Sequence, residues 1–305
     1  MNDGKILACR IPQSFRERLR EGIKGRYDIQ WLENEVETNV ALRDERPAAL
    51  LAGLCSKPSL EMPIRVANRL YPDLPVILVA PTANSETFVM MQSFGIGAAI
   101  PPTEVLYPEQ IELFFRHYLP PIDNRGLARF YPKGHSIKKA RIHDPARRED
   151  LLKDLRADFS DCKWVDHYDL QLLLEEMVNN AALHAFRTPR NQPKYGPNPK
   201  GELDADDQIL IEWATEDPDN GAPYGAICVM DNQGVLAPGQ IWRRLFRQSS
   251  QRGLLDTSGR GVYLTHLLTG LMGITVWPGQ WTETIAFLTP AYSNEERPIS
   301  VRVVR

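Results

Sequence analysis

One stretch, residues 169–186 (DLQLLLEEMVNNAALHAF), constrains this chain more than any other. Its leucines and alanines predict a helix that is buried around much of its circumference. Glu176, Asn180 and His184 recur at four-residue steps, so all three project from one face of that helix. These polar groups need partners, because burying them unpaired costs on the order of a few kcal/mol. The plain alternative is an amphipathic helix with a half-exposed polar stripe.

Composition and charge exclude several classes of protein. With 305 residues, 43% hydrophobic and 25% charged, the chain is typical of a globular protein of one large domain or two ordinary ones. Its 36 basic and 39 acidic residues give a formal charge of -3, which does not point to nucleic acid. The apolar runs are too short to cross a bilayer, and residues 1–5 do not open a signal peptide. The scattered cysteines, Cys9, Cys55, Cys162 and Cys228, indicate neither a zinc site nor disulfides, so we expect a cytoplasmic protein without membrane attachment.

The first 120 residues alternate short apolar strands with helices. A capping box, Ser14 with Glu17, predicts the start of the first helix. Because strands and helices alternate, we expect a parallel sheet covered on both faces. The strands are expected at 5–9, 27–32, 48–54, 76–80 and 98–100, and the helices at 15–23, 63–70, 86–94 and 108–118.

The segments LPVILVAPTAN and FGIGAAI resemble the second half of a two-component receiver domain. The family's acidic, phosphate-accepting and lysine positions read here as residues 10–12 (RIP), 52–53 (AG) and 101–103 (PPT). Only Thr82 matches, at the family's hydroxyl position. Without carboxylates there is neither a nucleophile nor a cation site. We therefore predict a pseudo-receiver that is not phosphorylated and serves docking or dimerisation; a purely structural flavodoxin-like domain is the alternative.

A turn-rich segment around residues 120–126 marks the expected domain boundary. Residues 121–142 are expected to be a linker or hairpin, with either a strand or a hairpin over 127–142. A helix is expected over 147–160, and Asp166 is expected to cap the central helix. His135 and His143 lie outside any long amphipathic helix, so a phospho-acceptor histidine is disfavoured. Residues 187–207 are expected to form an exposed loop.

Strands are expected at 209–214 and 225–230, and the second leads into Asp231 and Gly234. A carboxylate at the end of a buried strand is able to accept a hydrogen bond from an exocyclic amine, although an ordinary Asp-Asn turn is the common reading. Residues 258–264 (SGRGVYL) then place two glycines before an apolar helix over 262–271, and such a helix start favours anions. Strands at 273–277 and 282–288 are expected to pair, and the tail from residue 290 to be irregular.

The order of these motifs resembles the GHKL (Bergerat-fold) ATPases. A helix with ExxxNxxxH, a strand ending in Asp-Asn-x-Gly and then GRGxxL all occur in the family's order. LEEMVNNAALHAF and SGRGVYLTHLL are most similar to anti-sigma-factor serine kinases. The resemblance covers roughly residues 127–290 and implies an α+β two-layer sandwich, with the ATP-binding domain at 143–290 and a tail at 291–305.

The resemblance also implies roles for residues. Asn180 would hold Mg²⁺ that bridges the phosphates of ATP, Glu176 would be the general base, and Asp231 would read the adenine amino group. The other cofactor-binding residues that it implies are His184, Gly234, Gly259, Arg260 and Gly261. Arg243, Arg244, Arg247 and Arg252 would belong to a lid, with a solvated helix face as the alternative.

One departure from the family concerns the adenine-site box, DxGxG. Gln233 and Val235 stand at its glycine places, and Gly234 is out of step. The leading hypothesis is an ATP-binding, anti-sigma-factor-type serine/threonine kinase that acts on a protein partner and carries an unphosphorylatable receiver-like domain. The second hypothesis is an ATP-sensing interaction module without phosphotransfer, and a histidine kinase is a disfavoured third. A homodimer stays open, and no direct contact with nucleic acid is expected.

Overall fold

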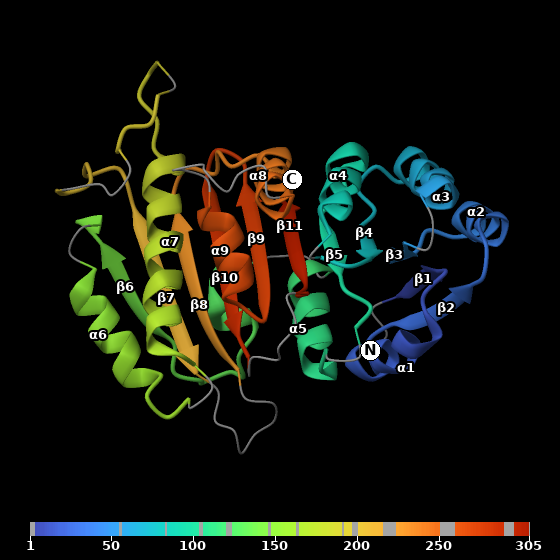
Figure 1. The fold of residues 1–305 in the computed structure, drawn as a ribbon, viewed down its shortest axis with the longest axis horizontal. Helices are drawn as coiled ribbons and strands as arrows, with labels where there is room; N and C mark the ends of the chain where they lie inside the picture. The colour runs from blue at the N-terminus through green and yellow to red at the C-terminus, as the bar shows by residue number, and fades with distance from the viewer. Residues whose placement is uncertain are drawn as a thin grey trace. The chain divides into compact units, whose positions relative to one another are not determined.

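The computed structural model divides the chain into two compact units, which Figure 1 shows in colour from the N-terminus to the C-terminus. The first comprises Met1–Pro121 and Asn294–Ser300, and the second comprises Ile122–Ser293 and Val301–Arg305. No helix of the described residues is long and apolar enough to cross a membrane. The structure describes residues 4–304 except 55–56, 83, 104–105, 120–123, 146–147, 163–164, 191, 197–200, 216–223, 251–259 and 290–295.

The first unit is a receiver-like α/β domain. Its strands pair in parallel in the order β2-β1-β3-β4-β5, which is the doubly wound order of flavodoxin-like folds. Strand and helix alternate along the chain, as expected. The strands are β1 (Lys5–Cys9), β2 (Asp28–Leu32), β3 (Ala49–Gly53), β4 (Val76–Val79) and β5 (Ala98–Ile100), and the helices are α1 (Gln13–Gly22), α2 (Glu35–Asp44), α3 (Lys57–Leu70), α4 (Ser85–Phe94) and α5 (Pro108–Tyr118).

Two helices of this unit differ from the expectation. The predicted capping box is wrong: α1 begins at Gln13 with Pro12 as its N-cap, so Ser14 lies within the helix and no side chain caps it. The helix α2 has no counterpart among the expected elements. Its exposed Val36 and Val40 blur the apolar period, while Asn34 caps it by accepting a hydrogen bond from the Glu37 N–H.

The C-terminal tail is not irregular throughout, as expected, but contains the strand β11 (Ile299–Val303). Ile299 and Ser300 pair antiparallel with Ala99 and Ala98 of β5. In the same unit, the Ser300 hydroxyl lies 2.9 Å from Nδ1 of the buried His117. These partners lie some 200 positions away along the chain, so local patterns could not indicate the strand.

The residues that the sequence comparison aligns with receiver site positions make structural contacts in this unit. Gly53 occupies the phospho-acceptor position, and an added Cβ would collide with the carbonyl oxygen of Arg10. Arg10 itself has a left-handed backbone, with φ 54°. The Thr82 hydroxyl accepts a hydrogen bond of 2.9 Å from the Arg297 N–H. That this unit is not phosphorylated stays a prediction.

The second unit is an antiparallel sheet with helices on one face. Its strands follow the order β9-β10-β8-β7-β6, and α6, α7 and α9 lie in front of them in Figure 1. The strands are β6 (Lys138–Ile142), β7 (Ile209–Thr215), β8 (Gly225–Asp231), β9 (Leu271–Trp277) and β10 (Trp281–Leu288), and the helices are η1 (Leu127–Arg129), α6 (Glu149–Asp158), α7 (His167–Ala185), α8 (Pro238–Ser249) and α9 (Gly261–Leu267).

The helix α7 is the core element of this unit. Its N-cap Asp166 accepts hydrogen bonds from the N–H groups of Tyr168 and Asp169, as the sequence predicts. Leu170, Leu173, Leu174, Met177 and Val178 are buried in one hydrophobic cluster with alternate residues of β7 and β8. This packing leaves the polar row of α7 beside the sheet, at the edge of the core.

Of the two alternatives for residues 127–142, the structure shows the strand: η1 is followed by the single strand β6, which pairs with β7. One further expectation for this unit needs correction. The last helix ends at Leu267 and not at 271. At that point the Gly270 N–H donates to the Phe287 carbonyl, and Leu271 begins the strand β9.

Candidate functional site

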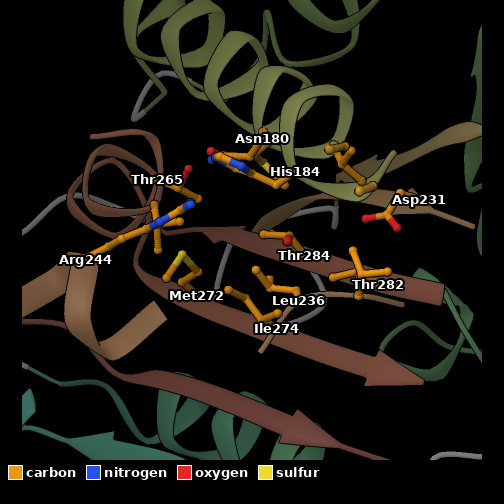
Figure 2. Close-up of a pocket in the computed structure, with 16 residues that line it drawn as sticks. Asn180, His184, Asp231, Leu236, Arg244, Thr265, Met272, Ile274, Thr282 and Thr284 are labelled. Carbon is orange, nitrogen blue, oxygen red and sulfur yellow. The ribbon is translucent and has the colours of Figure 1, made fainter. Parts of the chain in front are cut away.

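A cavity lies between α7, α8 and α9 and the ends of β8, β9 and β10 (Figure 2). Its volume is about 40 Å³, which is room for water but far less than the about 300–1,000 Å³ of usual ligand sites. Its apolar lining comes mainly from Met177, Val229, Leu236, Val262, Met272 and Ile274, and its polar lining from Asn180, His184, Asp231, Arg244, Thr265, Thr282 and Thr284.

The polar row of α7 meets the start of α9 at this cavity. An ideal Cβ on Gly261 would lie 2.6 Å from Glu176 Oε2 and 2.7 Å from Asn180 Nδ2. A larger residue at this position would therefore require the Glu176 and Asn180 side chains to shift. Asn180 and His184 line the cavity itself, and Glu176 lies one helical turn earlier on the same face. The structure thus brings together the α7 row and Gly261, as the sequence predicts.

The carboxyl group of Glu176 has a raised pKa. Burial is the largest cause, the neighbouring Glu175 adds to it, and Arg148 opposes it. Arg148 lies 3.9 Å from Glu175 and 3.4 Å from the Asn179 carboxamide oxygen. A raised pKa makes a carboxylate a better proton acceptor. Sequence reasoning missed Arg148, because only the tertiary packing of α6 on α7 brings it close.

The imidazole of His184 has its pKa lowered to about 4 by burial, and further by the nearby Arg244 and Arg187. At neutral pH it is therefore uncharged. A neutral imidazole offers one N–H donor and one acceptor. At neutral pH, His184 is thus a hydrogen-bonding residue and not a cation.

Asp231 ends β8 at the opposite end of the cavity from Arg244 (Figure 2). Burial raises the pKa of its carboxyl group to about 7, although backbone N–H groups oppose this shift, including that of Gln233 at 3.1 Å. Thr282 is its cross-strand partner on β10. Sequence reasoning did not single out Thr282, although the antiparallel pairing of β8 with β10 indicates it once the register is known.

Gly234 has a structural reason to be glycine. Its φ is 60°, and an added Cβ would collide with the carbonyl oxygen of Trp277 in the turn between β9 and β10. The Gly279 N–H donates to the Gly234 carbonyl at 3.2 Å. Val235 and Leu236, which follow Gly234, line the cavity. The side chain at the family's second glycine place therefore occupies part of the space at this wall.

The four expected lid arginines divide into different groups. Arg244 lines the cavity, whereas Arg243 and Arg247 are exposed on α8. Arg252, like the expected phosphate-contacting Gly259, lies outside the described residues. Arg260, expected beside the phosphates, is exposed at the N-terminus of α9.

In the described part of the chain, no group of three or more His, Cys, Asp or Glu side chains is placed to hold a metal ion. The Asn180 carboxamide stands at the cavity as an oxygen donor. Magnesium is commonly held by one or two protein oxygens together with ligand phosphates and water. The donor set at Asn180 thus fits a magnesium–nucleotide complex and does not fit a metal held by protein alone.

No protein-family model matches the chain, and no curated protein matches it. Similar solved structures include the response regulator DrrB of Thermotoga maritima, an OmpR/PhoB homolog, with 12% identity over 37% of this chain and 51% of that one and a TM-score of 0.32. The receiver domain of NtrC is 22% identical over 35% of this chain and 86% of its own length, with a TM-score of 0.29.

A third similar structure is NtrX from Brucella abortus in complex with ATP, with 13% identity over 61% of this chain and 36% of that one and a TM-score of 0.32. This chain spans about half of DrrB and about a third of NtrX. The receiver-like class of the first unit follows from its own strand order.

Proposed function

We propose that this chain is an ATP-binding signalling regulator, and that its second unit binds magnesium–ATP in the cavity between α7 and the sheet. One observation carries the proposal. Asn180 and His184 of α7, Asp231 of β8 and Val262 of α9 are far apart in sequence and line one cavity. They are hydrogen-bonding and apolar groups of the kinds that orient a nucleotide. The resemblance of these motifs to GHKL ATPases supports the same assignment.

In this proposal, the two ends of the cavity have different tasks. Asp231, with Thr282 beside it, accepts a hydrogen bond from the adenine amino group, and Asn180 contributes an oxygen to magnesium on the phosphates. His184 donates or accepts a hydrogen bond as a neutral imidazole. Because the cavity holds only about 40 Å³, binding requires the wall formed by Leu236, Arg244 and Val262 to move outward.

The reaction that we propose is transfer of the γ-phosphate to a serine or threonine hydroxyl of a protein partner. Glu176 accepts the proton of that hydroxyl, a role that its raised pKa favours. Magnesium would neutralise charge on the phosphates when it is bound. Asn180 holds the phosphate end in place, so the hydroxyl meets it in line.

A second function, ATP sensing without phosphotransfer, is favoured by a specific observation. Val235 and Leu236 line a cavity that is small for a nucleotide, and Gly261 lies directly against Glu176 and Asn180. Binding then displaces the helices at this wall, and a partner reads that change. No phosphate leaves the nucleotide in this case.

The first test is calorimetric titration of ATP with and without Mg²⁺. The parent chain should bind ATP more tightly with Mg²⁺, and Asn180→Ala should lose that magnesium dependence. Asn179→Ala is the matched control. Asn179 neighbours Asn180 on α7, but its carboxamide lies toward Arg148 and does not line the cavity. Equal behaviour of the two variants would contradict the site.

The second test separates the two functions. Under the kinase proposal, Glu176→Gln should abolish transfer of labelled phosphate from ATP to protein in an extract of cells that lack the protein, while ATP affinity changes little. Under the sensing proposal, neither the parent nor the variant labels any protein. In that case, ATP changes hydrogen exchange in α8 and α9 without being consumed.

A further inference from the structure

Arg244 is a charged group of the cavity that has no counter-charge among the described residues. Its side chain extends from α8 to the cavity near Thr265, on the side toward which Asn180 and His184 project (Figure 2). Its Nη1 atom is buried and has no hydrogen-bond partner in the part of the chain that the structure describes. A buried donor of this kind is costly unless something binds it.

Other half-buried arginines of the second unit are paired. Arg129 pairs with Glu283, and Arg148 lies by Glu175 and Asn179. Arg244 has a cation as its neighbour instead: burial first, and then Arg187, lower the pKa of its guanidinium group. Arg187 is exposed, so solvent screens part of its repulsion of Arg244, and an anion bound at Arg244 would offset the rest.

The other groups at this end of the cavity do not supply the anion. Of the described residues that line the cavity, only Asp231 carries a carboxylate, and it lies at the far end. His184 is neutral because Arg244 and Arg187 add to the effect of burial on it. This end of the cavity therefore carries a positive charge beside uncharged polar groups, and it is matched to a ligand that brings negative charge.

We propose that Arg244 binds the phosphate chain of the nucleotide and that this contact makes the cavity selective for nucleotides over nucleosides. The inference rests on the proposed ATP site and deepens it by naming the residue that recognises charge. The planar guanidinium fork suits two phosphate oxygens at once. Arg244 belongs to α8, so phosphate bound to it fixes that helix against α7.

The test is calorimetric titration of the full chain with ATP, adenosine and inorganic tripolyphosphate, each without metal so that Asn180 does not contribute through magnesium. The parent should bind ATP at least about 10-fold more tightly than adenosine. Arg244→Gln should lower ATP affinity about 10- to 100-fold and leave adenosine affinity within about 3-fold. Arg244→Lys should recover only part of the loss, because an ammonium lacks the fork.

Arg243→Gln is the matched control, since Arg243 is the neighbouring residue on α8 and is exposed. It should change neither affinity by more than about 2-fold. A thermal unfolding scan of each variant shows whether it is folded. The comparison of ATP with adenosine in the parent chain tests the inference even if a variant does not fold.

The outcomes separate this inference from the proposed function. Equal affinity of the parent for ATP and adenosine, or an equal loss for both ligands in Arg244→Gln, would overturn the role of Arg244 and leave the nucleotide site standing. Tripolyphosphate binding that depends on Arg244, without binding of ATP or adenosine, would keep the anion site and overturn the nucleotide function. Binding of none of the three ligands without metal would overturn the role of Arg244, and a parent chain that also fails to bind ATP with Mg²⁺ would overturn the nucleotide site.

Discussion

Buried charged side chains on the two faces of the sheet formed by β7, β8 and β10 differ in whether they have a partner of opposite charge. On the face toward α7, Asp231 is buried with a carboxyl pKa of about 7, and Arg244 has an unpartnered Nη1 atom among the described residues. On the other face, Glu283 is fully buried but pairs with Arg129 and accepts the Gly126 N–H at 2.6 Å. Glu212 on that face accepts the Leu127 N–H at 2.7 Å.

The difference shows how a structural charge cluster is told apart from a binding site. Glu283 pairs with Arg129 and accepts the Gly126 N–H, while Glu212 pairs with Lys139 and accepts the Leu127 N–H, so both carboxylates of this cluster have a counter-charge without a ligand. Asp231 and Arg244 stand at opposite ends of a cavity. Asp231 accepts hydrogen bonds from uncharged groups such as the Gln233 N–H, and the Arg244 Nη1 atom has no partner among the described residues. Since unpaired buried charge destabilises a protein, it persists where a ligand or function requires it.

The largest effect should come from breaking the complete cluster. Glu283→Ala leaves Arg129 buried without its carboxylate, and we expect the free energy of unfolding to fall by about 3–5 kcal/mol, measured by urea denaturation. Asp204→Ala is the control from an exposed pair with Lys194 and should cost at most about 1 kcal/mol. A loss for Glu283→Ala no larger than that of the control would show that the cluster contributes little.

The next effect concerns the glycine on which this cluster closes. Gly126 has φ 79°, and a Cβ there would collide with the Glu212 carboxylate. We expect Gly126→Ala to lower the free energy of unfolding by about 2–4 kcal/mol, because strain and collision add. Gly134→Ala is a matched control, since Gly134 has φ 94° but open space around it. Equal losses would mean that backbone strain alone matters.

The smallest effect should have the opposite sign and lies on the cavity face. The pKa of Asp231 is about 7 in the folded chain against an ordinary 3.8, so the folded state holds a proton that the unfolded state releases between these values. Stability therefore falls as pH rises from about 4 to about 7. Asp231→Asn removes this loss and should raise the free energy of unfolding by about 1–3 kcal/mol at pH 8.

The same variant should show little gain at pH 4, because the folded carboxyl group is protonated there and the unfolded one has only begun to release its proton. Urea denaturation at the two pH values measures the difference, and calorimetry should find weaker ATP binding to the variant. A gain in the free energy of unfolding of equal size at both pH values would show that the ionisation of Asp231 is not its cause. Loss of stability at pH 8 would show that the ionised carboxylate is satisfied by its neighbours, as Glu283 is.

Much of this arrangement could be predicted from local sequence patterns. The four-residue steps of Glu176, Asn180 and His184 place them on one helix face by geometry alone, and Asp166 indicates where that helix begins. The end of β8 at Asp231 follows from an apolar run that stops at a carboxylate. Each of these signals depends only on residues that are close along the chain.

The remaining features depend on contacts between distant residues. Thr282 meets Asp231 only through the register of β8 with β10, and β11 forms only because β5 offers an unpaired edge. The exposed valines of α2 obscure the apolar period that would have predicted this helix. Its stability comes from a cap and from tertiary packing.

By itself, the sequence determined the alternation of strands and helices in the first unit, the polar row on α7 and the absence of receiver carboxylates. Only the tertiary structure decided which arginine of α8 enters the cavity, and that Gly261 lies against Glu176 and Asn180. The physical reason is that periodicity gives the direction of a side chain within its own element. Whether a charge finds a partner depends on which elements pack around it.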